Sequence, residues 1–150
     1  MGVIERLNTH REWANQRIIE WYLALPQSEE YCLKMVSHIL LGEETWLLRL
    51  SGESNPETAR RITAWEFLPP EELKPRSKAN NAEWREVLRS DLSRTVRYFR
   101  FGGEACESVV SDIVTHVCLH AQYHRGQIAA QAARVGLNPI PTDFIVFSRL

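Results

Sequence analysis

The chain has 150 residues, of which 44% are hydrophobic, and a formal net charge of −1. This length fits one domain, residues 1–150, with a core of its own. The near-zero charge gives no reason to expect nucleic acid or an anionic membrane surface as a partner. No apolar run is nearly long enough to cross a bilayer, and no export signal is recognisable. Because the cysteines are odd in number and form no close pair, we expect a reducing cytoplasm; they are Cys32, Cys106 and Cys118.

Apolar residues recur at helical spacing in several segments. The predicted helices are Ile4–Leu25, Ser28–Leu50, Asn80 or Asn81 to Phe99, and Ser108–Gly136. Gly136 suits the position after a helix end, and either asparagine could cap the third helix. The closing segment, Asp143–Leu150, is apolar enough to pack back on the helices. No segment has a convincing strand pattern.

A long connection, about Gly52 to Ala79, separates the second and third predicted helices. Connections of this length are uncommon in compact domains and usually serve a function or a crossover. It contains the apolar run Trp65–Leu68, which indicates that part of it is packed. The predicted fold is therefore all-α, a four-helix bundle with a long crossover between helices 2 and 3.

Three of the five histidines stand four residues apart, at His116, His120 and His124. Residues at this spacing share one face of a helix, and imidazole is the usual protein ligand for zinc, copper, iron and nickel. The apolar stripe of this helix is centred on Val117. His120 and His124 lie within about 60° of that centre, whereas His116 lies about 100° away. We therefore predict His120 and His124 as a metal-binding pair, with His116 flanking it.

Two ligands on one helix do not complete a site, because a catalytic zinc centre has three protein ligands and one open position. His38 lies beside the core face of the second helix and is the best remaining candidate. A single histidine is more often a surface or core-capping residue than a ligand, and we assign His10 and His116 to that role. Zinc and nickel suit a three-histidine site best, and iron and copper also accept imidazole. The predicted metal ligands are His38, His120 and His124.

Several segments resemble a known family. His116–Ile128, followed by Gly136 and Pro141–Phe144, resembles the C-terminal signature of the DinB/YfiT-like family, and Ser37–Trp46 and Trp13–Asn15 resemble its first two helices. The resemblance implies a four-helix bundle with a crossover, a homodimer, and a divalent metal held by His38, His120 and His124. It also implies a metal-dependent thiol S-transferase or isomerase. Such an enzyme would use a low-molecular-weight thiol, such as bacillithiol or mycothiol, and a small-molecule substrate.

A metal with three neutral ligands keeps its double positive charge and lowers the pKa of a bound water or thiol. The sequence is thus compatible with a thiol transferase or a metal-dependent hydrolase. A non-catalytic, stress-related metal-binding bundle is the alternative outside enzymology. The chain's own cysteines are poor candidates for a nucleophile, since Cys118 lies about 200° around its helix from His120.

Gly42 and Arg49 stack on His38 at helical spacing. We expect them to line a pocket, in which glycine leaves room and arginine could hold an anionic group of a substrate. A surface salt bridge is the alternative role for Arg49.

Other residues near the motifs have less certain assignments. We expect Gly126 to let a neighbouring helix approach closely. Arg125 and Gln127 could orient ligands or bind a dimer partner, and the alternative is a solvated role or a contact between helices. Glu43 should point inward but away from His38, and so should not support that histidine.

Overall fold

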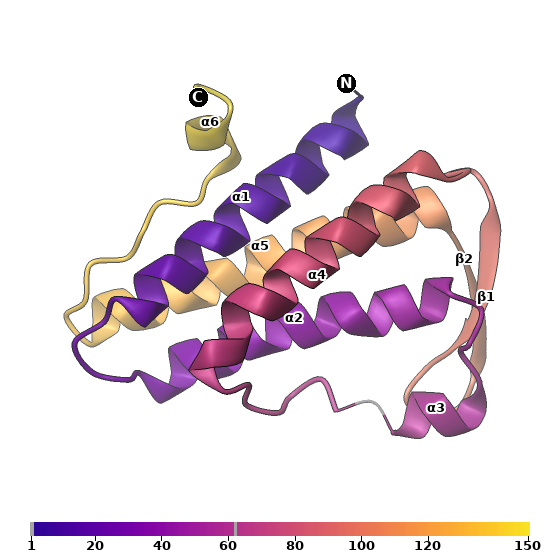
Figure 1. Ribbon diagram of the computed structural model, residues 1–150, viewed down its shortest axis with the longest axis horizontal. Helices are drawn as coiled ribbons and strands as arrows, with labels where there is room; N and C mark the ends of the chain where they lie inside the picture. The colour runs from indigo at the N-terminus through magenta and orange to yellow at the C-terminus, as the bar shows by residue number, and fades with distance from the viewer. Residues whose placement is uncertain (1, 62) are drawn as a thin grey trace.

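A computed structural model describes residues 2–61 and 63–150; residues 1 and 62, the latter within the predicted crossover, lie outside the description. Four long helices form a bundle, which confirms the predicted helical fold (Figure 1). They are α1 (Val3–Leu23), α2 (Glu30–Leu50), α4 (Pro70–Arg89) and α5 (Val110–Arg134). Two short helices and two strands complete the chain: α3 (Pro56–Arg60), α6 (Phe144–Phe147), β1 (Thr95–Phe99) and β2 (Ala105–Val109).

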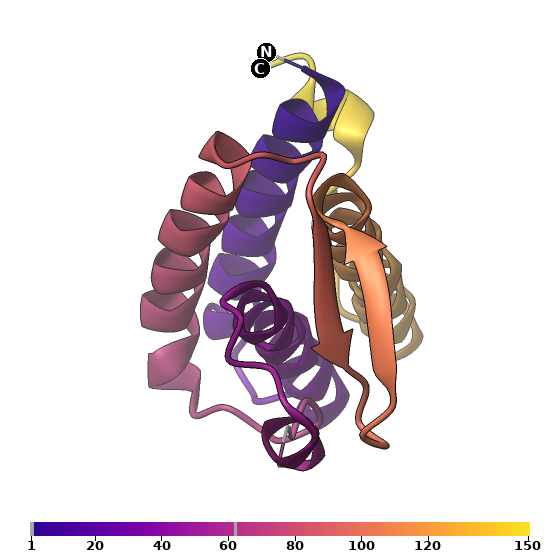
Figure 2. The same ribbon diagram turned by 90° about the vertical axis from the view of Figure 1, so that its right-hand side faces the viewer.

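The long helices run side by side, with α4 on one side of α1 and α2 and α5 on the other (Figure 2). Each of the outer helices therefore packs against both central ones. The interior contains two apolar clusters. One includes Ile18, Ile39 and Ile128, and the other includes Leu47, Trp84 and Val117. None of the described helices is both long and apolar enough to span a bilayer.

The third long helix differs from the prediction at both ends, because α4 spans Pro70–Arg89 rather than Asn80 or Asn81 to Phe99. Proline fits the first position of a helix, where the missing N–H is not needed, and Glu71 and Glu72 follow in the first turn. Asn80 caps nothing, since it is buried within the helix. The crossover correspondingly shortens and ends at Pro69.

A β-hairpin occupies the segment in which the sequence predicted the end of a helix, so the expectation of no strands was wrong. β1 pairs with β2 in antiparallel register, with Thr95 opposite Val109. Val96 and Tyr98 are buried, whereas Thr95 and Arg97 are exposed, which is the two-residue period of a strand with one covered face. Gly103 adopts a φ of +88° in the connecting loop, a conformation that suits glycine. The hairpin places β1 against α2.

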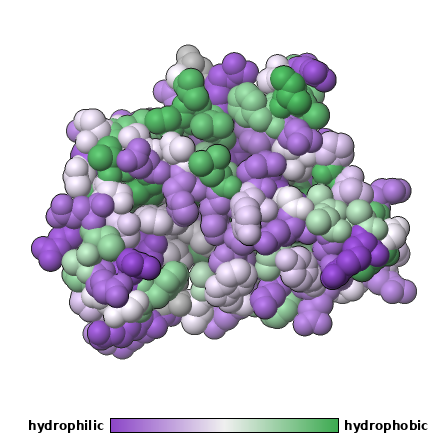
Figure 3. Space-filling model, turned by 180° about the vertical axis from the view of Figure 1, so that it is seen from behind, coloured by the Kyte–Doolittle hydropathy of each residue, from purple (hydrophilic) through white to green (hydrophobic). Residues whose placement is uncertain are grey.

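The closing segment packs back on α1, as predicted. His10 is buried there, with its Nε2 atom 2.7 Å from the carbonyl oxygen of Thr142 and its ring near those of Phe144 and Phe147. Its role is structural. Apolar side chains gather at this end of the molecule, where both termini lie (Figure 3).

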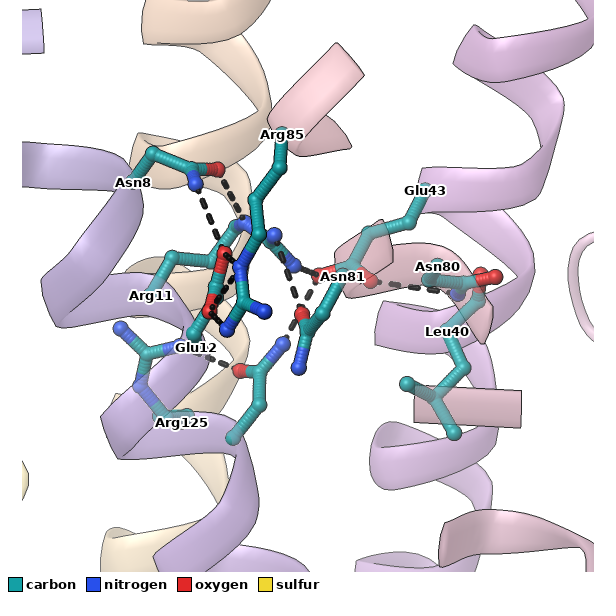
Figure 4. A network of polar contacts seen from close by, with 10 residues as sticks. Asn8, Arg11, Glu12, Leu40, Glu43, Asn80, Asn81, Arg85 and Arg125 are labelled. Carbon is teal, nitrogen blue, oxygen red and sulfur yellow. Dashed lines mark hydrogen bonds and ion pairs between the residues drawn. The ribbon is translucent and has the colours of Figure 1, made fainter. Parts of the chain in front are cut away.

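A buried polar network joins the long helices around Glu43 (Figure 4). The fully buried Arg11 donates to Oε1 of Glu43 at 2.5 Å, and Asn15 donates to the same oxygen at 2.8 Å. Asn80 of α4 donates to the other carboxylate oxygen at 3.2 Å. Arg125 of α5 donates to Oδ1 of Asn15 at 2.6 Å. One carboxylate on α2 thus connects directly to α1 and α4, and through Asn15 to α5.

The network contains two buried arginines and one carboxylate. Burial lowers the pKa of Arg125 to about 10, and the charge of Glu43 opposes that shift. Glu43 points inward and away from His38, as expected, and serves the bundle rather than a histidine. Arg125 likewise belongs to the contacts between helices.

Replacing Glu43 should destabilise the protein strongly, because the substitution leaves buried cationic and amide groups unpaired. We expect Glu43→Ala to lower the free energy of unfolding by about 3–5 kcal/mol in urea titrations. The neighbouring Glu44 pairs with Arg76 in a partly exposed position. Glu44→Ala should cost about 1 kcal/mol or less. Equal effects of the two substitutions would contradict a stabilising role for the network.

Candidate metal centre

The structure brings His38 of α2 next to His120 and His124 of α5. The Nε2 atom of His120 lies 3.2 Å from that of His38 and 3.1 Å from that of His124. One ligand atom from each of the three residues lies within 4.8 Å of the others, an arrangement that could hold a metal ion. These are the three residues that the sequence suggested as ligands.

The separations between the ring nitrogens suit a small cation. Two nitrogens bound at 2.0–2.1 Å to a tetrahedral zinc ion lie about 3.3 Å apart. The observed distances of 3.2 and 3.1 Å approach this value. The two pairs that include His120 therefore have a spacing that suits such an ion.

The hydrogen bonds at Nδ1 of His38 and His124 determine that the Nε2 atoms of these residues carry lone pairs. Nδ1 of His38 lies 2.5 Å from the carbonyl oxygen of Ala64, and Nδ1 of His124 lies 2.7 Å from Oε1 of Gln127. Because these oxygens accept hydrogen bonds, both Nδ1 atoms carry hydrogen and both Nε2 atoms present lone pairs to the centre. Only His120 could then place an N–H among the three Nε2 atoms, so the cluster has fewer hydrogen-bond donors than acceptors. A cation would satisfy all three nitrogens at once.

Burial keeps the three imidazoles uncharged near neutral pH. It is the largest cause of the lowered pKa of His38 and His124. The pKa of His120 falls to about 3, first through burial and then through the neighbouring histidines. Neutral imidazole is the form that binds metals, so burial keeps the three residues in the state that a metal ion would require.

Gly42 allows the ring of His120 to lie against α2. A side-chain Cβ atom at position 42 would stand 3.1 Å from Cε1 of His120, closer than ordinary van der Waals contact. The expectation that Gly42 leaves room is thus confirmed. The expectation for Gly126 was wrong, because this residue is exposed and a Cβ there would meet nothing within 4 Å among the described residues.

The crossover contributes two residues that sequence reasoning did not connect with the histidines. Besides the carbonyl of Ala64, the ring of Trp65 stacks on that of His38, with centroids 3.6 Å apart and planes at 9°. The backbone N–H of Leu68 donates to Oγ of Ser37 at 3.0 Å and anchors this segment on α2. The apolar run Trp65–Leu68 predicted packing, but it gave no sign of the surface against which the segment packs.

The residues that flank His120 and His124 have different roles. Gln127 orients His124, whereas Arg125 takes part in the buried network. The ring of His116 lies 5.2 Å from that of Trp46 and 5.8 Å from that of His120, centroid to centroid. It stays outside the cluster, in the flanking position predicted for it.

A cavity of about 280 Å³ adjoins His38 and His120. It lies between α2, the crossover, the hairpin and α5. The remaining lining residues are Gly42, Thr45, Trp46, Arg49, Ala64, Tyr98, Arg100, Phe101 and His116. The histidine cluster is therefore accessible to a small molecule.

The cysteines are unsuited to act as nucleophiles in this cavity. Burial raises the pKa of Cys32 to about 12 and that of Cys118 to about 11, so both remain thiols at neutral pH. None of the three cysteines is among the residues that line the cavity.

The metal-free protein should lose stability in mild acid. Burial lowers the pKa of all five histidines from the ordinary value of 6.5. Below that pH the unfolded chain binds more protons than the folded one, so stability is present above about pH 6.5 and lost as the pH falls. By circular dichroism, we expect the melting temperature to fall by roughly 5 °C or more between pH 7.5 and 5.5. His120→Gln should weaken the dependence of the melting temperature on pH. An unchanged dependence would contradict the claim that burial of His120 causes part of the acid sensitivity.

Two glycine substitutions should separate metal affinity from helix stability. Gly42→Ala must displace the ring of His120, and we expect zinc affinity to fall about tenfold or more in competition titrations. The metal-free melting temperature should not fall, because alanine favours a helix over glycine by about 1 kcal/mol. Gly126→Ala is the matched control, since it lies on α5 in open space and should keep wild-type affinity. Equal zinc affinities in the two variants would show that contact at position 42 does not hold the ring.

Comparison with known proteins identifies a related protein and a family. The chain is 26% identical over 164 aligned positions to the protein named "Protein DinB" from Bacillus subtilis (strain 168), covering 93% of this chain and 90% of the relative. No solved structure gave a significant match. Residues 6–150 match the DinB family, so nearly the whole chain is covered. The protein belongs to the DinB family.

Proposed function

We propose that the protein binds a divalent metal ion through His38, His120 and His124 and catalyses thiol transfer or thiol-assisted isomerisation. The carrying observation is that three neutral imidazoles converge beside an open cavity. When bound, a divalent cation would lower the pKa of a thiol or water that joins it. Zinc and nickel fit this donor set.

The surrounding residues would organise the reaction without entering it. Ala64 and Gln127 hold the rings of His38 and His124 in one orientation, and the indole of Trp65 covers the outer face of His38. The cavity lies beside these rings. A closed structural site would have no such space, and the cavity therefore supports a catalytic role over a purely structural one.

The thiol would come from a small molecule, because Cys32 and Cys118 are buried and remain protonated. The aromatic rings of Trp46, Tyr98 and Phe101 line the cavity and would exclude water from a bound organic substrate. This environment favours thiol transfer over hydrolysis, which needs water at the centre. Three free cysteines support placement in a reducing cytoplasm.

The test of ligation is the metal content of untagged protein after metal is added back and excess is removed. We expect one ion per chain in the wild type and a strong loss in His38→Ala, His120→Ala and His124→Ala. His116→Ala is the matched control and should retain the ion. Full stoichiometry in all three ligand variants would overturn the assignment. Elemental analysis of protein purified without added metal identifies the native ion.

The test of activity is consumption of a low-molecular-weight thiol in the presence of an electrophilic substrate. The metal-loaded wild type should accelerate it, and His124→Ala should abolish the acceleration while keeping its fold by circular dichroism. Stoichiometric metal without turnover of any thiol and electrophile pair would instead favour a non-catalytic metal-binding protein. Release of acid from ester substrates without thiol consumption would favour a hydrolase.

A further inference from the structure

Arg49 is a buried cation at the edge of the cavity. It is 5% exposed and lies on α2, on the same side as His38 and Gly42. Its guanidinium carbon lies 4.4 Å from the ring centroid of Trp46 and 5.2 Å from those of Tyr98 and Phe101. Aromatic rings from α2 and the hairpin therefore fix the side chain. The surface salt bridge considered from the sequence is not formed among the described residues.

The charge of Arg49 has no anionic partner in the part of the chain that the structure describes. Its buried Nε atom lacks a hydrogen-bond acceptor there, and no ion pair involves its guanidinium. The buried Arg11, in contrast, contacts Glu43. Leaving a buried charge unpaired is costly, so such a group usually meets a ligand or a counter-charge.

The cavity has a composition that favours an anion. Among the described residues, its lining includes two arginines and three histidines but no aspartate or glutamate. The second arginine, Arg100, is largely exposed and lies 3.7 Å from Glu104. Arg49 is thus the cation whose hydrogen-bonding capacity remains free beside the cavity. The aromatic rings around it offer contact area for an apolar part of the same molecule.

We infer that Arg49 binds the carboxylate, or a comparable oxyanion, of the small molecule on which the centre acts; this inference rests on the proposed function. Arg49 lies eleven residues after His38 on one helix, which separates their Cα atoms by about 16 Å. Helical side chains lean toward the N-terminus, so the guanidinium reaches back toward the histidines. The anionic group would therefore bind at a distance from the reacting atom. The site would select extended organic acids.

The experiment compares ligands that differ only in the charge of one end. The first pair is 6-sulfanylhexanoate and 6-sulfanylhexanamide, titrated calorimetrically into zinc-loaded protein. The second pair is trans-cinnamate and cinnamamide, titrated with and without zinc, because neither contains a thiol. We expect the acid of at least one pair to bind about tenfold or more tightly than its amide. Preference in the first pair places the carboxylate on the thiol, and preference in the second places it on the other substrate.

Three variants assign the preference to Arg49. Arg49→Gln should remove it, so that acid and amide bind within about twofold of each other, while zinc content stays at the wild-type level. Arg49→Lys keeps a charge and should retain part of the preference, which protects the test if the glutamine variant folds poorly. Arg100→Gln is the matched control on the same cavity and should change the preference by less than about threefold.

The result that overturns the inference is equal binding of acid and amide in both pairs by the wild type. An undiminished preference in Arg49→Gln would also overturn it. Failure of the proposed metal site would be distinct, because it would appear as absent zinc in the wild type. The cinnamate pair, measured without zinc, would still report on Arg49 in that case.

Discussion

The close approach of α5 to α2 at Gly42 is the constraint on which the histidine cluster depends. A Cβ atom at position 42 would stand 3.1 Å from Cε1 of His120, so the ring would have to shift from the position in which it meets His38. The contact between these helices also buries apolar residues on both sides, including Ile39 and Ile128. The burial of these apolar residues therefore holds the three imidazoles together, although the lone pairs of their nitrogens repel one another.

The two sides of α2 have separate tasks. His38, Gly42 and Arg49 face the cavity, whereas Glu43 points into the network that ties α2 to α1 and α4. The side with Glu43 fixes the position of the helix, and the side with His38 and Arg49 is available to contact a small molecule. Such a division suits a site that needs its ligands in place beforehand, because movement of α2 would separate His38 from the pair on α5.

The fold could be predicted where the local sequence of an element is sufficient to determine its structure. Periodicity identified α1, α2 and α5 to within a few residues, and Gly136 ends α5 with a φ of +79°, as its position suggested. The errors came from competing local signals. Pro75 falls within the segment that was assigned to the long connection but lies inside α4. The alternating residues of β1 were assigned to a helix although two glycines follow them closely.

The candidate site also has a part that local sequence could predict and a part that it could not. The spacing of His120 and His124 and the placement of His38 follow from helical geometry, so the sequence could suggest all three. The contacts made by Ala64 and Trp65 depend on the path of the crossover, which no local pattern specifies. That Arg49 meets no counter-charge among the described residues depends on its surroundings in three dimensions and could not be read from neighbours in the chain.

The bond from His38 to the carbonyl of Ala64 has a consequence for divergence among related proteins. The acceptor belongs to the main chain, so almost any amino acid at this position would supply it. Selection would then act on the route of the segment, held in part by Ser37 and Leu68, rather than on the identity of residue 64. Homologues could exchange that amino acid freely and still hold the imidazole in the same tautomer, and a search for invariant side chains would miss the contact.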